Sequence, residues 1–149
     1  MKMAIVTDAR STLVQMIADA GFTPDRYDPD ITERNFPLEY EGSYNASGLN
    51  LFGGDREWSI NEVEAAVTLE GGCLEGLVRG MAYLKTNPNA LKDGPIILPA
   101  SSWVFPDGSA RVLFAGLGGG KPWLDLNWSV RSHRWPWHYR FLVSGKPVV

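Results

Sequence analysis

The sequence predicts a two-layer α+β domain, in which a four-stranded antiparallel meander made by the C-terminal third packs against one long helix. Three observations support this prediction. Apolar residues recur at helical spacing over about 60–85. Apolar and polar residues alternate between turn signals over 96–143. The 149 residues are enough to bury a core, so we expect residues 1–149 to form a single domain.

A shorter helix is predicted near the N-terminus, over about 9–20. Leu13, Val14 and Ile17 fall on one helical face, and a glycine follows as a stop signal. Residues 3–6 fit a short strand ahead of this helix. Because no second strand–helix unit follows, a doubly wound parallel sheet is not expected.

Residues 22–57 are predicted to be an irregular acidic segment, because prolines and glycines interrupt every candidate element. Two short strands are expected within it, over 36–41 and 49–52. The segment carries eight Asp and Glu residues. It is either a solvated surface or an acidic lobe that covers the basic C-terminal part or mimics a polyanion.

The long helix has a clear start and an ambiguous middle. Ser59 and Glu62 form a capping-box pattern before the apolar repeat. In an unbroken helix Glu70 falls on the apolar face, where a carboxylate must be paired with a basic side chain. Alternatively, Gly71 ends a first helix, a second begins near Cys73, and Glu70 reaches solvent.

Three glycines recur every four residues in this region: Gly72, Gly76 and Gly80. Glycine costs roughly 1 kcal/mol relative to alanine inside a helix, so we expect a packing reason for the repeat. One interpretation is close approach of a strand or of the N-terminal helix. The other is a helix–helix contact in a homodimer.

The C-terminal third reads as four strands. Pro106-Asp-Gly108 is a strong turn signal between the first two, and 116–122 is predicted to be a glycine-rich loop. In the third strand, Leu124, Leu126, Trp128 and Val130 alternate onto one face. The expected strands cover residues 96–105, 111–115, 123–130 and 138–143.

Charge and tryptophan content are distributed unevenly along the chain. Up to Pro95 there are 15 acidic and 8 basic residues, a net of −7, and from Ile96 onward there are 2 and 6, a net of +4. Both histidines and five of the six tryptophans lie in the basic part. This split indicates that the two parts pack together or that the basic part meets an anionic partner.

The basic-aromatic stretch, residues 131–140, has the highest density of basic and aromatic side chains and is the strongest candidate for partner binding. Alternation on the final strand predicts that Trp137 and Tyr139 face the helix, while His138 and Arg140 point outward. Three interpretations are open: a protein interface, a surface for single-stranded nucleic acid, or a structural hairpin covered by the acidic segment. The candidate residues are Arg131, His133, Arg134, Trp135, His138 and Arg140.

The glycine-rich run invites comparison with a phosphate-binding P-loop, but it lacks the required pattern. Ala115 stands where the first glycine is needed, Pro122 replaces the Ser or Thr, and a strand rather than a helix follows. A simple connecting loop is the plain expectation. The alternative is an anion-binding loop, able to hold a phosphate or nucleotide through backbone N–H groups and a lysine. Its residues are Gly118, Gly119, Gly120 and Lys121.

Catalytic signatures are weak. His133, His138 and Asp125 lack metal-ligand spacing and a nucleophile motif, so no metal or cofactor is expected and a small histidine-dependent enzyme ranks third. Cys73 is the only cysteine, which excludes an internal disulfide, and its spacing predicts a small buried residue.

Taken together, the sequence predicts a small, non-enzymatic binding protein. The lack of motifs fits accessory proteins such as inhibitors of phage or mobile-element origin. The apolar runs are too short for a signal peptide or a membrane span, so a cytoplasmic protein is expected. A protein partner is favoured, and a nucleotide or nucleic acid is the alternative.

Overall fold

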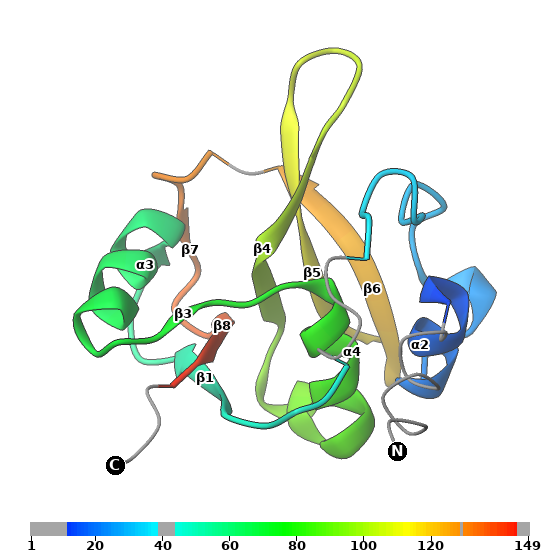
Figure 1. Ribbon diagram of the computed structural model, residues 1–149, viewed down its shortest axis with the longest axis horizontal. Coiled ribbons are helices and arrows are strands. Elements are labelled where there is room, and N and C mark those ends of the chain that lie inside the picture. Colours follow the sequence, from blue (N-terminus) through cyan, green and yellow to red (C-terminus); the bar gives the residue numbers. More distant parts are fainter. Residues whose placement is uncertain (1–11, 39–43, 129, 146–149) are drawn as a thin grey trace, which may run out of the picture.

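A computed structural model describes residues 12–38, 44–128 and 130–145, and it confirms the α+β class (Figure 1). In these residues a mixed six-stranded sheet has the order β1-β8-β4-β5-β6, with β3 also paired to β8. The strands are β1 (Leu49–Gly53), β3 (Cys73–Leu74), β4 (Ile96–Val104), β5 (Ala110–Gly118), β6 (Lys121–Trp128) and β8 (Arg140–Ser144). A separate pair is formed by β2 (Trp58–Ser59) and β7 (Arg134–Trp135). The helices are α2 (Leu13–Asp19), α3 (Ile60–Leu69) and α4 (Leu77–Thr86), and two short 3₁₀ turns span Pro24–Arg26 and Ala90–Asp93.

The N-terminal helix ends where predicted, before a glycine with φ of 103°. The Thr12 side chain caps α2 by accepting a hydrogen bond from the Gln15 N–H at 3.1 Å. Leu13 and Ile17 are buried as expected, but Val14 is 64% exposed and Met16 takes its place in the core. Thr12 has an extended backbone, so the helix begins at Leu13, later than the predicted start near residue 9. Residues 9–11 themselves and the strand predicted over 3–6 lie outside the described residues.

The single long helix was a wrong prediction, because the region 60–85 forms two helices with a strand between them. The capping box is present: the Glu62 N–H donates to Ser59 Oγ at 3.1 Å and Glu62 Oε1 accepts from the Ser59 N–H at 2.9 Å. Gly71 has φ of 80°, which reverses the chain after α3 and leaves Glu70 exposed. Helical periodicity therefore continued by coincidence through β3. The split alternative is correct about Gly71 and Glu70, but the second helix begins at Leu77 and not near Cys73.

The glycine repeat is explained by packing within the chain. A Cβ at Gly72 would collide with the Ser144 carbonyl, and one at Gly80 would lie 2.8 Å from a Leu98 methyl group. Gly76 is the N-cap of α4 and lies against Ser101. Only Gly80 is inside a helix, so the three residues do not form one helical ridge, and the structure gives the homodimer contact no support.

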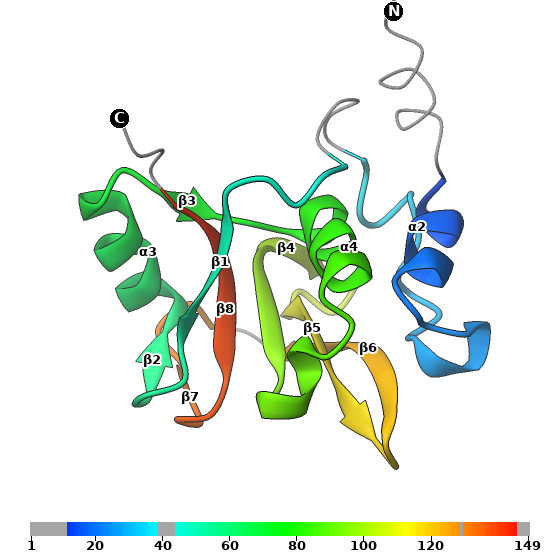
Figure 2. The same cartoon turned by 90° about the horizontal axis from the view of Figure 1, so that it is seen from below.

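The meander prediction holds for three strands and fails for the fourth. Consecutive antiparallel pairs join β4, β5 and β6, and the Phe105 N–H donates to the Ser109 carbonyl at 2.7 Å across the predicted turn. However, β8 lies between β1 and β4 and runs parallel to β4. After β6 the chain forms β7 against β2 and then re-enters the sheet as β8, between β1 and β4 (Figure 2).

The sheet carries cores on both faces, so the two-layer prediction was also wrong. Ile96 and Leu98 of β4 join the core beneath α2 and α4, whereas Ile97 joins a second core beneath α3. This alternation follows from the two-residue period of a strand. Helices therefore cover opposite faces of one sheet (Figure 2).

The irregular segment 22–57 contains the predicted strand at 49–52, seen as β1. The strand predicted over 36–41 is absent from its described part: Phe36 is buried in a turn region and pairs with no strand. The remainder of that prediction, 39–41, lies outside the described residues.

Candidate partner-binding surface

The fold divides the basic-aromatic stretch between the core and the surface. Trp135 is only 1% exposed and packs with Ile60 and Val63 beneath α3. Trp137, predicted to face the helix, is instead 61% exposed. The β2–β7 pair explains the reversal, because it draws Trp135 opposite Trp58 and inward. Trp135 is therefore a core residue and cannot be a contact residue.

Arg131 and Arg134 are ion-paired on the surface to glutamates of α3. Arg134 Nη2 lies 2.9 Å from Glu62 Oε2, and Arg131 pairs with Glu64. Arg131 Nε also donates to Asn61 Oδ1 at 2.9 Å. Both arginine side chains remain about half exposed. The carboxylates that pair with these arginines thus come from α3 and not from the described part of the segment 22–57. Exposed pairs of this kind contribute little stability.

The Glu62 carboxylate serves both the helix cap and this surface. The backbone N–H of Ser59 is the main reason that the pKa of Glu62 lies below its usual value, and the nearby Arg134 lowers the pKa further. The carboxylate therefore stays ionised through the mildly acidic range and holds the arginine against α3.

His138 and Arg140 lie elsewhere, near the start of β8. Arg140 was predicted to point outward, but it is half-buried and its Nη2 donates to the Ala90 and Gly94 carbonyls at 2.6 and 2.8 Å. The half-buried His138 ring packs 5.0 Å from Tyr139 and 5.5 Å from Trp137. His133 is exposed and packs edge-on against Trp135 at 5.1 Å. The two histidines are therefore joined only indirectly, through the Trp135 and Tyr139 rings, whose centres lie 5.5 Å apart.

The glycine-rich run is a tight hairpin rather than a loop. Strands β5 and β6 stay paired up to Gly118 and Lys121, and only Gly119 and Gly120, with φ of 61° and 79°, form the turn. Arg26 donates to the Gly118 and Lys121 carbonyls. The candidate anion-binding run thus already presents two carbonyl oxygens to a cation.

The opposite end of this sheet carries an aromatic cluster that the sequence reasoning did not single out. The hairpin of β4 and β5 projects from the body of the protein as an arm (Figure 1). On it the Trp103 and Phe105 rings lie 4.3 Å apart, and the Arg111 guanidinium lies 4.3 Å from the Phe105 ring centre. Register places Trp103, Arg111 and Trp128 in one row across three strands.

We call this region the arm end. Its members lie at the end of the sheet where the arm projects and where the chain leaves β6, and all of them except the half-buried Arg111 are exposed. Trp128 is 56% exposed, Val130 46% and Val104 62%. The arm end comprises Val104, Arg111, Trp128, Val130, Arg131, His133 and Arg134. The signal available in the sequence was the pair of rings directly before a strong turn.

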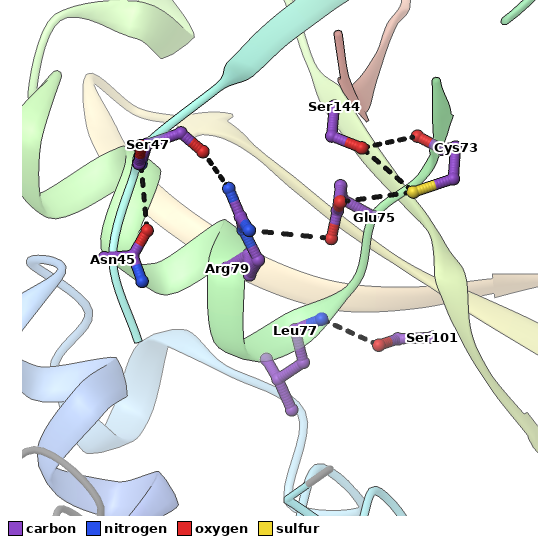
Figure 3. Close-up of polar contacts among 8 residues, drawn as sticks. All are labelled: Asn45, Ser47, Cys73, Glu75, Leu77, Arg79, Ser101 and Ser144. Atoms are coloured by element: carbon purple, nitrogen blue, oxygen red, sulfur yellow. Dashed lines mark hydrogen bonds and ion pairs between the residues drawn. The ribbon is translucent and has the colours of Figure 1, made fainter. Parts of the chain in front are cut away.

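Cys73 was expected to be buried, but it is exposed. Its Sγ lies 2.9 Å from Ser144 Oγ and donates to Glu75 Oε2 at 3.5 Å, and Glu75 in turn approaches Arg79 at 3.9 Å (Figure 3). No imidazole takes part in this cluster among the described residues, so it lacks the base that activates a cysteine nucleophile.

The described residues contain no group of three or more His, Cys, Asp or Glu side chains placed to hold a metal ion. In the same part of the chain no helix has the length and apolar character needed to cross a membrane. Comparisons with protein-family models, with curated proteins and with solved structures give no match.

Proposed function

We propose that this chain is a small, non-enzymatic binding protein that docks on a partner protein through the arm end. The observation that carries the proposal is the cross-strand row of Trp103, Arg111 and Trp128, which runs from the projecting hairpin of β4 and β5 onto the end of β6. Tryptophan and arginine are the side chains most enriched at the energetic centres of protein interfaces. Val104 and Val130 are exposed at the same end of the sheet and add apolar area, with Val104 on the opposite face of the hairpin from the row.

The charge arrangement favours a protein over a nucleic acid. Arg131 and Arg134 are paired to α3 carboxylates, and Arg111 lies over Phe105. Nucleic-acid binding needs cations that are free to replace counterions along a phosphate backbone. A mixed surface of paired charges and apolar side chains instead suits a partner with a complementary protein surface, as an inhibitor or another accessory protein would have.

The test is capture by the full chain, immobilised and exposed to an extract of its native host. Wild type is compared with a Val104→Asp, Trp128→Ala variant, and with Trp137→Ala as the matched control. Trp137 has similar exposure but lies outside the arm end. We expect wild type and the control to retain the same protein partner and the arm-end variant to lose it.

Two outcomes would overturn this proposal. One is retention of the partner by a folded arm-end variant. The other is capture of nucleic acid with an affinity that falls steeply between 50 and 200 mM salt, on the order of 10³-fold or more, which is the response to many phosphate contacts.

A further inference from the structure

Strand β1 is an edge of the sheet, and part of its outer side makes no hydrogen bond with the residues that the structure describes. In an antiparallel ladder, hydrogen-bonded pairs alternate with pairs whose backbone groups point away from each other. The Gly145 N–H donates to the Gly48 carbonyl at 2.9 Å, which sets the phase of the ladder between β1 and β8. Asn50 therefore bonds toward β8, and Leu51 presents its N–H and C=O to the outside.

A second contact fixes the same phase from the far side of β8. The Leu142 carbonyl, opposite Leu51, accepts from the Glu75 N–H at 3.1 Å and so points away from β1. Gly53 lies two residues beyond Leu51 and also turns its backbone groups outward. Within the described residues these outward groups make no hydrogen bond.

Nothing in β1 protects this edge. Sheet edges are commonly blocked by a charged residue, a proline or a bulge. The strand Leu-Asn-Leu-Phe-Gly has no charge and no proline, and its register with β8 is regular over all five residues. It is therefore able to accept another strand.

On the side of the sheet that α4 covers, a pocket of about 410 Å³ lies beside Leu51 at this edge. Arg140 lines it, and its guanidinium bonds only to main-chain carbonyls and forms no ion pair with a described carboxylate. Asn87 and Asn89 add amide groups, and Asp93 also lines the pocket but forms no ion pair with Arg140. The unpaired guanidinium makes an acidic side chain the best match for this pocket.

On the opposite side of the sheet, which α3 covers, a second pocket of about 170 Å³ lies at the same edge. Phe52, Ala66, Val67 and Val143 line it, so most of its wall is apolar. Successive side chains of a strand point to opposite faces. A strand added to β1 would therefore place alternate side chains in a polar pocket and in an apolar one.

We propose that β1 accepts an extended segment of a partner protein as an additional strand, with an acidic side chain toward Arg140 and an apolar side chain in the pocket beside α3. Main-chain hydrogen bonds to Leu51 and Gly53 supply affinity, and the two pockets supply specificity. A second copy of this chain is a poorer occupant, because its own β1 carries no carboxylate to meet Arg140. This surface is independent of the arm end.

The test uses two capped synthetic peptides, Ser-Val-Glu-Val-Glu-Val-Ser and its analogue with lysine in place of glutamate. Each is titrated into the full chain while the amide NMR signals are followed. We expect the acidic peptide to shift the Leu51 and Gly53 amides, to slow their hydrogen exchange, and to bind about tenfold more tightly than the lysine peptide, because a bond between charged groups is at stake.

Two controls separate strand addition from general attraction. The acidic peptide N-methylated at alternate residues loses the N–H groups of one edge, and it should not bind in that form. Arg140→Gln should remove the preference for glutamate, whereas Arg134→Gln should leave it unchanged. Equal binding of the two parent peptides, binding of the N-methylated peptide, amide shifts confined to other strands, or dimerisation through β1 without peptide would each refute the proposal. The peptide controls decide the question even if the Arg140 variant does not fold.

Discussion

The two ends of β6 each place a tryptophan near an arginine, but with opposite results. At the start of the strand, Arg26 lies 4.2 Å above the Trp123 ring and donates to the carbonyls of the glycine hairpin. At the end of the strand, Arg111 lies over Phe105 instead, and Trp128 has no ring or cation contact within the part of the chain that the structure describes. Trp123 is 36% exposed and Trp128 56%.

This difference separates an end completed by the chain itself from an end that is left open. Arg26 satisfies backbone carbonyls and covers an aromatic face, so the glycine hairpin needs nothing further for stability. The arm end keeps large apolar side chains in water at a cost that a partner would remove on binding.

The largest expected difference in stability is between the replacement of a buried tryptophan and the replacement of an exposed one. Trp135→Ala removes a core side chain and should lower the free energy of unfolding by about 3–5 kcal/mol. Trp128→Ala should change it by no more than about 0.5 kcal/mol, because its ring has little packing to lose. Urea unfolding followed by circular dichroism measures both. A large loss at Trp128 would mean that the arm end is structural.

The next largest effect on stability is expected from the removal of the Arg26 side chain. Arg26→Ala should lower the free energy of unfolding by about 1–2 kcal/mol, because the hairpin carbonyls lose a charged donor and Trp123 loses its cover. Arg111→Ala is the matched change at the open end, and we expect it to cost less than about 1 kcal/mol. Equal losses for the two variants would remove the distinction between the ends. Thermal unfolding of the two purified proteins gives the comparison.

The helix beneath the arm-end arginines should respond to loss of its cap. Ser59→Ala removes the acceptor for the Glu62 N–H and should cost about 1 kcal/mol. Thr12→Ala, at the cap of α2, is the equivalent change away from this surface and should cost a similar amount. If Ser59→Ala has no effect on unfolding, the capping box does not hold α3 in place.

A smaller effect is expected from pH. Hydrogen bonding to Ser59 and the charge of Arg134 place the pKa of Glu62 below its usual value. Its contribution to stability is therefore complete above the unfolded pKa and is lost as the pH falls through the lower folded pKa. Glu62→Gln should flatten the dependence of unfolding on pH in this acidic range. If the free energy of unfolding of the variant changes with pH as steeply as that of wild type, other carboxylates are responsible for the pH dependence.

Local signals in the sequence predicted the local features well. The capping box at Ser59 and the turn at 106–108 depend on contacts a few residues apart, and both are present. Leu124 and Leu126 are buried as the alternation predicted, but Trp128 is exposed because the sheet face that it occupies is no longer covered at the arm end, and Val130 lies beyond the end of β6. Alternation identifies a face, and coverage of that face depends on the rest of the fold.

The pairing of strands that are far apart in the sequence could not be predicted. Nothing in residues 138–143 indicates that β8 returns to lie parallel to β4, and this pairing is what moves Arg140 away from Arg134. The break in the long helix did have a signal, since Gly71 is a strong terminator, but the apolar repeat outweighed it. The candidate site was therefore recovered only in part: Arg131, His133 and Arg134 stay on one surface, and Trp135 belongs to the core.

The most direct measurement is oxidative footprinting of tryptophan in the full chain, alone and with its captured partner. Trp128 and Trp137 are both well exposed, but only Trp128 belongs to the arm end. We predict that the partner protects Trp128 from oxidation and leaves Trp137 as reactive as in the free protein. Protection of Trp137 with no change at Trp128 would contradict the assignment of the arm end as the contact surface.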